Sequence, residues 1–154
     1  MSSKIAATAG INNPRTAASD HTSRSFVHFL PAVARIVLGL SLLVFGLNAF
    51  LNFIPPPPTP LPERAMEFVG ALANSGYMLP LIGVTHLLVG TLLVINRWVP
   101  LALVVLAPFL VNSVAFHLFL ERSGLPMALI FLAVELYLAW VYRDAFRPLF
   151  SRRA

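Results

Sequence analysis

The chain has 154 residues, of which 58% are hydrophobic and only 11% are charged, and it contains no cysteine. Soluble domains carry about 25% charged residues, so this chain has too few charges to cover a water-facing surface, and its mean hydropathy of +0.80 indicates a membrane protein. The absence of cysteine excludes disulfides, thiolate metal ligands and a redox step on a CxxC motif of this chain. The net charge of +5 is spread singly around apolar segments, which argues against a nucleic-acid partner.

The N-terminal segment, residues 1–25, is rich in Ser, Thr and Ala and shows no apolar periodicity, so we expect a disordered tail. A transmembrane domain is predicted over residues 26–150, followed by a basic tail at residues 151–154. Four apolar runs in this domain are long enough to cross a hydrocarbon core about 30 Å thick at about 1.5 Å per residue. These predicted spans are residues 31–53, 77–95, 99–120 and 125–142. The sequence therefore predicts an all-α fold, a four-helix transmembrane bundle.

The segment between the first two spans has two parts. Residues 54–63 read IPPPPTPLPE, and because proline lacks an N–H and fixes φ, they predict a stiff extended connector. Residues 63–76 are too polar to span, but Met66, Val69 and Leu72 recur at helical spacing opposite charged residues. This pattern predicts a short amphipathic helix lying in the membrane interface, between the first and second transmembrane helices.

Basic residues gather on one side of the predicted spans. Of the eleven lysines and arginines, all except Arg64 and Arg122 fall on the side shared by the N-terminus, the turn at residues 96–98 and the C-terminus. The positive-inside rule therefore places both termini in the cytoplasm. We expect a multi-pass protein of the inner (plasma) membrane, with the lipid bilayer as its first partner.

Glycines recur along two of the predicted spans. Gly39 and Gly46 lie seven residues apart in the first span, and Gly83 and Gly90 lie seven apart in the second. Small residues at such spacing let two helix backbones approach closely in a membrane. We therefore expect these glycines on the inward faces of their helices.

Polar side chains inside the spans are the candidate ligand-binding residues: Asn48, Asn52, His86, Asn112, His117 and Glu135. A carboxylate at the centre of a membrane helix costs on the order of 3 kcal/mol, so Glu135 should face the interior, be paired or carry a proton. His86 and Glu135 both fall near the midpoints of their spans, and we expect a hydrogen bond between them. Asn48 and Asn112 would complete a polar layer near the midplane, with Asn52 and His117 closer to the outer interface.

Each of these residues also has a structural interpretation. An asparagine in a membrane helix usually holds helices together, through hydrogen bonds worth about 0.6–2 kcal/mol. A Glu135–His86 pair is compatible with a packing contact and with a proton site, so the catalytic residues stay unknown and this pair is the candidate. No HxxxH or ExxH spacing supports a metal site. The depths of His86 and His117 differ by about 10 Å at helical rise, which argues against a haem held by both.

The order of these features resembles the DoxX/DoxD-like family of small four-helix membrane proteins over about residues 30–150. The stretches that carry the resemblance are ARIVLGLSLLVFGLNAFLNF, the proline-rich connector, GVTHLLVG, NRWVPLAL leading to VNSVAFHLFL, and ELYLAWVYRDAFRPLF. The resemblance implies an association with quinone-linked oxidation, as in the membrane subunits of thiosulfate:quinone oxidoreductase, and makes a quinone the one cofactor to consider. In that family the position of His86 is often glutamate, so the histidine here departs from a two-carboxylate site with Glu135.

Three functions stay open at this point. One is a redox-associated membrane subunit that binds a quinone-like ring in the bundle, and the second is a non-catalytic scaffold or assembly factor. The third is a transporter, which the sequence supports least, because a chain of this size would have to oligomerise and no internal repeat is visible. The second implies a protein partner or a homo-oligomer. Whether the chain is an enzyme is left open.

Overall fold

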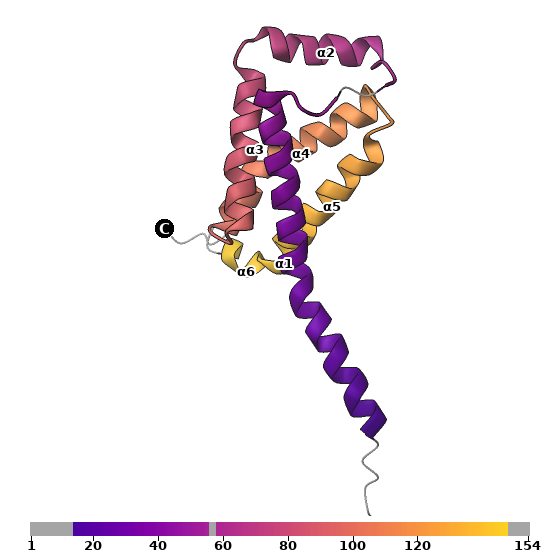
Figure 1. Ribbon diagram of the computed structural model, residues 1–154, viewed down its shortest axis with the longest axis vertical. Coiled ribbons are helices and arrows are strands. Elements are labelled where there is room, and N and C mark those ends of the chain that lie inside the picture. The colour runs from indigo at the N-terminus through magenta and orange to yellow at the C-terminus, as the bar shows by residue number, and fades with distance from the viewer. Residues whose placement is uncertain (1–13, 56–57, 148–154) are drawn as a thin grey trace, which may run out of the picture. The chain divides into compact units, whose positions relative to one another are not determined.

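The computed structural model describes the backbone of residues 14–55 and 58–147, and side chains from Phe29 onward. The chain divides into two units, Met1–Leu30 and Pro31–Ala154. Every element in the described residues is a helix, as predicted (Figure 1). The helices are α1 (Pro14–Leu51), α2 (Glu63–Asn74), α3 (Met78–Val94), α4 (Val99–Phe119), α5 (Leu125–Val141) and α6 (Arg143–Phe146).

The first helix is longer than the sequence pattern predicts. It begins at Pro14, within the segment expected to be a disordered tail, and it runs through Pro31. Pro14 stands in the first turn, where proline is favoured, whereas Pro31 lies inside the helix and cannot donate a hydrogen bond to the carbonyl oxygen of residue 27. The remaining parts of the two predicted tails, residues 1–13 and 151–154, lie outside the described residues.

Two helical stretches are long and apolar enough to cross a membrane by themselves, namely Phe29–Leu51, with 23 residues, and α4, with 21 residues. The α2–α3 pair passes the same test only as one span bent by 85°, and α5 is a shorter apolar helix of 17 residues. Large apolar side chains cover the outward faces, for example Val37 and Leu40 on α1 and Leu136 on α5. Such surfaces suit hydrocarbon rather than water, so the structure supports a membrane protein with two or three candidate spans.

The short amphipathic helix predicted between the first two spans is present as α2. It makes an angle of 85° with α3 and lies across the end of that helix (Figure 1). Its charged residues Glu63, Arg64 and Glu67 are exposed. Phe68 packs against Phe116 of α4, with ring centroids 5.7 Å apart. This contact joins α2 to the bundle through an apolar side chain, as expected of a helix with one polar face.

Glycines bring α1 and α3 into close contact, as the sequence predicts. A Cβ atom added at Gly39 would lie 3.0 Å from the carbonyl oxygen of Gly90, and one added at Gly90 would lie 2.8 Å from that of Gly39. Two helical turns further along α1, a Cβ at Gly46 would lie 3.0 Å from the carbonyl oxygen of Gly83. The four residues therefore form a glycine seam, in which two antiparallel helices meet backbone to backbone.

The core of the second unit is centred on α4. Leu103, Leu106 and Leu110 of this helix are at most 3% exposed, and they pack with buried residues of α1, α3 and α5. Their spacing of three and four residues places them on one face of α4. Lipid tails are as apolar as leucine, so close packing rather than the hydrophobic effect holds this face in place in a membrane.

Arg35 is a buried charge near the start of the first predicted span, and it was not among the candidate residues. It is 8% exposed, and its Nη1 donates hydrogen bonds to the carbonyl oxygens of Leu93 and of Val94, the latter at 3.3 Å. The last four carbonyls of a helix lack partners within that helix and carry partial negative charge. The guanidinium therefore caps the C-terminal end of α3 and fixes α1 against it.

Candidate functional site

The prediction of a hydrogen bond between His86 and Glu135 is wrong. Both side chains are buried, at 6% and 4% exposure, but among the described residues neither Nε2 of His86 nor Oε1 of Glu135 has a hydrogen-bond partner. The two residues line separate cavities on different parts of the bundle. Counting residues fixes the depth of a side chain along a helix but not the direction in which it leaves the helix, and the two directions differ.

His86 lines a cavity of about 540 Å³ between α1, α3, α4 and α5, which we call the histidine cavity. Its aromatic wall is formed by Phe45, Phe109 and Phe131. The His86 ring meets the Phe109 ring edge to face, with centroids 4.3 Å apart and planes at 88°. Phe45 and Phe131 make a second edge contact at 6.1 Å. The cavity therefore offers flat apolar surfaces, the usual lining of a site for a ring-shaped ligand.

Polar side chains are few in this cavity: Asn48, His86, Ser113 and His117. Of these, His86 has a buried ring nitrogen without a partner among the described residues. Leaving a buried donor or acceptor unsatisfied costs about 1–3 kcal/mol, and such groups are rare in native structures. His86 thus has hydrogen-bonding capacity left for a ligand in this cavity.

Two of the candidate residues terminate α1. The side-chain oxygen of Asn48 accepts a hydrogen bond from the N–H of Ile54 at 2.7 Å. Asn52 has a φ of 48°, and its N–H donates to the carbonyl oxygen of Asn48 at 2.9 Å. Asparagine tolerates this left-handed conformation better than most residues, and it commonly follows the last helical residue. Asn52 is exposed, so its described role is to end the helix before the proline connector.

His117 belongs to a polar cluster at the turn between α4 and α5, formed with Glu121, Ser123 and Gly124. The His117 Nδ1 atom lies 3.0 Å from Oε2 of Glu121, and the Gly124 N–H donates to the same oxygen at 3.0 Å. The Ser123 N–H donates to Oε1 of Glu121 at 2.7 Å. One carboxylate thus closes the turn. We call this group the turn cluster.

The hydrogen bonds of the turn cluster alter the acidity of Glu121. The side chain of Ser123 is the largest cause, and the N–H groups of Gly124 and Ser123 and the ring of His117 act in the same direction, against the effect of burial. Together they lower the pKa of Glu121 from 4.5 to about 2. Glu121 was not among the candidate residues identified from the sequence. The spacing of four residues between His117 and Glu121 was the signal that could have revealed the pair.

Asn112 does not belong to a polar layer, contrary to the prediction. It lies on the exposed side of α4, next to the exposed Val111, whereas Leu106 and Leu110 face the core. The core face of α4 is set by its leucines, and Asn112 falls outside their row. It therefore contributes to neither cavity.

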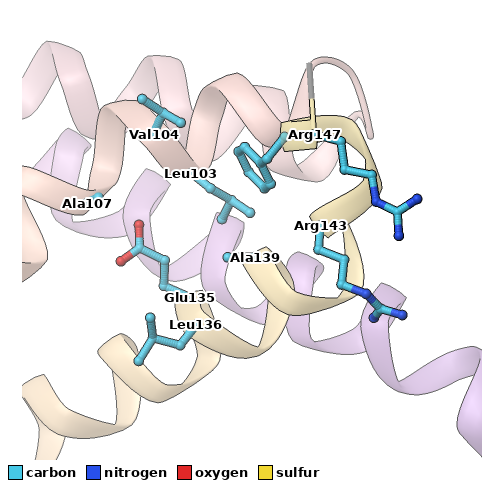
Figure 2. Close-up of a pocket in the computed structure, with 9 residues that line it drawn as sticks. Leu103, Val104, Ala107, Glu135, Leu136, Ala139, Arg143 and Arg147 are labelled. Atoms are coloured by element: carbon cyan, nitrogen blue, oxygen red, sulfur yellow. The ribbon is translucent and has the colours of Figure 1, made fainter. Parts of the chain in front are cut away.

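Glu135 lines a cavity of about 570 Å³ formed by α4, α5 and the short α6, which we call the glutamate groove. Figure 2 shows its carboxylate directed into the space beside Ala107, with Leu103 and Ala139 between it and the two arginines of the groove. Arg143 and Arg147 turn their guanidinium groups away from Glu135 (Figure 2).

Comparison with other proteins gives no further guide. Within the described residues, no group of three or more His, Cys, Asp or Glu side chains is arranged to hold a metal ion. No family model, no curated protein and no solved structure matches the chain. The resemblance to DoxX/DoxD-like proteins therefore stays a sequence-based expectation, and the two cavities are the structural features that bear on function.

Proposed function

We propose that this chain is a small integral membrane protein that binds a quinone-like ring in the histidine cavity. The observation that carries the proposal is the buried Nε2 of His86, which has no partner among the described residues and belongs to a residue that lines a cavity with aromatic walls. The apolar helices support the membrane location.

The cavity fits the chemistry of a quinone head group. A quinone ring is flat and apolar and carries carbonyl oxygens that accept hydrogen bonds. Phe45, Phe109 and Phe131 supply apolar faces and edges for the ring. An N–H on Nε2 of His86 would donate to one carbonyl, and the Ser113 hydroxyl is a second donor on the lining. The volume of about 540 Å³ lies within the range of small-molecule sites.

The proposed protein crosses the inner membrane four times, through α1, α3, α4 and α5. Both termini lie in the cytoplasm in this proposal, because the basic residues gather on that side. The resemblance to DoxX/DoxD-like proteins supports a quinone-linked role. Because the chain has no cysteine, any thiol or sulfur chemistry would belong to a partner protein, and this chain would hold and orient the ring.

The test compares quinone binding to the purified full chain and to two variants in lipid nanodiscs. A short-tailed benzoquinone should bind saturably to the wild type and about tenfold or more weakly to His86→Leu, since a lost hydrogen bond in a dry site is worth about 1.4 kcal/mol or more. His86→Leu should keep or raise the thermal stability, because it removes an unsatisfied polar group. The matched control is Asn112→Leu, which changes an exposed polar residue of α4 and should bind as the wild type does. Saturable binding that is unchanged in His86→Leu, or no binding to any form, would overturn the proposal.

The alternative function, a non-catalytic scaffold or assembly factor, is favoured by a different observation. Asn48, Asn52 and His117 all make contacts that end a helix or close a turn. Three of the six candidate ligand-binding residues therefore have structural roles. On this alternative, a stable protein partner co-purifies with the chain, and His86→Leu leaves the cellular phenotype intact.

A further inference from the structure

The glutamate groove lies apart from the histidine cavity and shares no lining residue with it. Its walls are almost wholly apolar, with Leu103, Val104 and Ala107 from α4 and Leu136 and Ala139 from α5. Val104 and Leu136 are 50% and 60% exposed, so the groove is open on the outward face of the bundle. In a membrane this face meets lipid, and a ligand would enter from the bilayer.

One ionisable group is buried in this apolar groove. Glu135 is 4% exposed, and its Oε1 has no hydrogen-bond partner among the described residues. A carboxyl group placed in hydrocarbon without a partner is unfavourable by several kcal/mol, which is why intramembrane carboxyl groups commonly mark functional sites. The carboxylate is directed into the groove (Figure 2), so a bound ligand can supply the missing partner.

The arginines of the groove do not supply that partner. Arg147 makes an ion pair with Asp144, with Nε 3.1 Å from Oδ1. The Arg143 guanidinium lies over the Trp140 ring, 4.9 Å from its centroid, and donates to the Trp140 carbonyl oxygen at 3.2 Å. Both guanidinium groups point away from the carboxylate (Figure 2). They are therefore engaged at the end of the groove, outside its apolar part.

We propose that the glutamate groove binds a lipophilic cation, a compound that carries its positive charge on a bulky apolar frame. The apolar walls receive the frame, and Glu135 pairs with the charge. Such a pair is strong in a groove with few competing polar groups, because the local dielectric constant is low. The volume of about 570 Å³ lies within the range of small-molecule sites.

The charge pattern disfavours an anionic amphiphile in the same groove. Arg147 already pairs with Asp144, and Arg143 lies over the Trp140 ring. The acyl chain of an anion held by either arginine would lie against the buried carboxylate. A cation removes the unfavourable isolation of Glu135, whereas an anion increases it. The sign of the ligand charge is thus the property to test first.

The experiment uses two probes of nearly the same shape and opposite charge, tetraphenylphosphonium and tetraphenylborate. Each is titrated against the purified full chain in nanodiscs of uncharged lipid, with equilibrium dialysis as the readout. Tetraphenylphosphonium should bind saturably, and tetraphenylborate should show only the partition into lipid seen with empty nanodiscs. In Glu135→Gln the affinity for the cation should fall about tenfold or more, the effect of removing one partner of a buried charge pair. Tetraphenylborate binding as tightly as the cation, or cation binding unchanged in Glu135→Gln, would overturn the proposal.

Two further variants separate this proposal from the others. Leu136→Trp narrows the groove without changing its charge, so it should weaken cation binding. This test does not depend on whether Glu135→Gln folds. Unchanged cation binding in Leu136→Trp also counts against the groove as the binding site. His86→Leu changes the other cavity and should leave cation binding intact. If the cation does not bind while quinone binding persists, only the proposal on the groove fails.

Discussion

The contact between His117 and Gly124 in the turn cluster predicts that even a single added methyl group disrupts the turn. In Gly124→Ala, the new Cβ would lie 2.2 Å from Cε1 and 2.5 Å from Nδ1 of His117. Non-bonded carbon atoms rest about 3.5–4.0 Å apart, so the ring would have to move by about 1.3 Å or more. Gly124 has a φ of −83°, which alanine adopts freely, so any destabilisation comes from the clash and not from the backbone.

The magnitude follows from what the imidazole would lose by moving. Insertion of an extra methyl group into a packed site costs about 1–3 kcal/mol. The ring cannot shift that far and keep its 3.0 Å contact with Glu121, and a hydrogen bond to a charged group contributes about 1.5–3 kcal/mol. The side chain of His117 is 23% exposed, so water replaces part of this loss. We therefore expect Gly124→Ala to lower the free energy of unfolding by about 2 kcal/mol.

A double-mutant cycle tests this reasoning. Unfolding is followed by tryptophan fluorescence during titration of detergent-solubilised protein with sodium dodecyl sulfate. In a His117→Ala background the clash is gone, so Gly124→Ala should cost less than about 0.5 kcal/mol there. The matched control is Gly70→Ala on α2, where nothing lies within 4 Å of the added Cβ, and no loss is expected. An equal cost for Gly124→Ala in both backgrounds would refute the assignment of its effect to His117.

Three more predictions concern other contacts of the bundle. Gly39→Ala should lower the free energy of unfolding by about 1–3 kcal/mol in the same titration, because its Cβ would lie 2.9 Å from Val94 Cγ2 and 3.0 Å from the Gly90 carbonyl oxygen; a neutral result would mean that α1 and α3 do not meet at this seam. Arg35→Met should cost about 1.5–3 kcal/mol, because the carbonyls at the end of α3 lose a charged donor, and a stability equal to the wild type would contradict the capping role. The pKa of Glu121 is lowered to about 2, so its contribution to stability is present above its ordinary pKa of 4.5 and is lost as the pH falls toward 2; Glu121→Gln should reduce this acid-dependent loss, and an identical pH profile would count against it.

The helices of the fold were predictable because each apolar run must satisfy its own backbone hydrogen bonds, which favours a helix whatever surrounds it. The observed α3, Met78–Val94, and α5, Leu125–Val141, end within one residue of the predicted spans. The glycine seam was also predictable, because close approach in a membrane needs small residues at regular spacing. The start of α1 was not, since a polar stretch that prolongs an existing helix has no apolar pattern of its own.

The candidate site was predicted less well. Glu135 and His86 were identified as buried, since an ionisable residue in an apolar run must avoid lipid. Their pairing was wrong because depth does not determine direction, and the same shortcoming placed the exposed Asn112 in the interior. Glu121 was missed although it lies four residues after its partner His117, a spacing that a helix brings together. Arg35 was missed for a different reason. Its partners are main-chain carbonyls at the end of α3, and a sequence does not show which helix end faces which side chain.

The glycine seam between α1 and α3 also has a consequence for motion. A contact made by side chains can rearrange by exchanging rotamers, but glycine has no side chain and loses no rotamer freedom when it is packed. Sliding one helix along the other would break contact at both glycine pairs together. The α1–α3 pair should therefore behave as the stiff element of the bundle, and adjustment to a ligand in the histidine cavity should come from α4 and α5, whose side chains complete its lining.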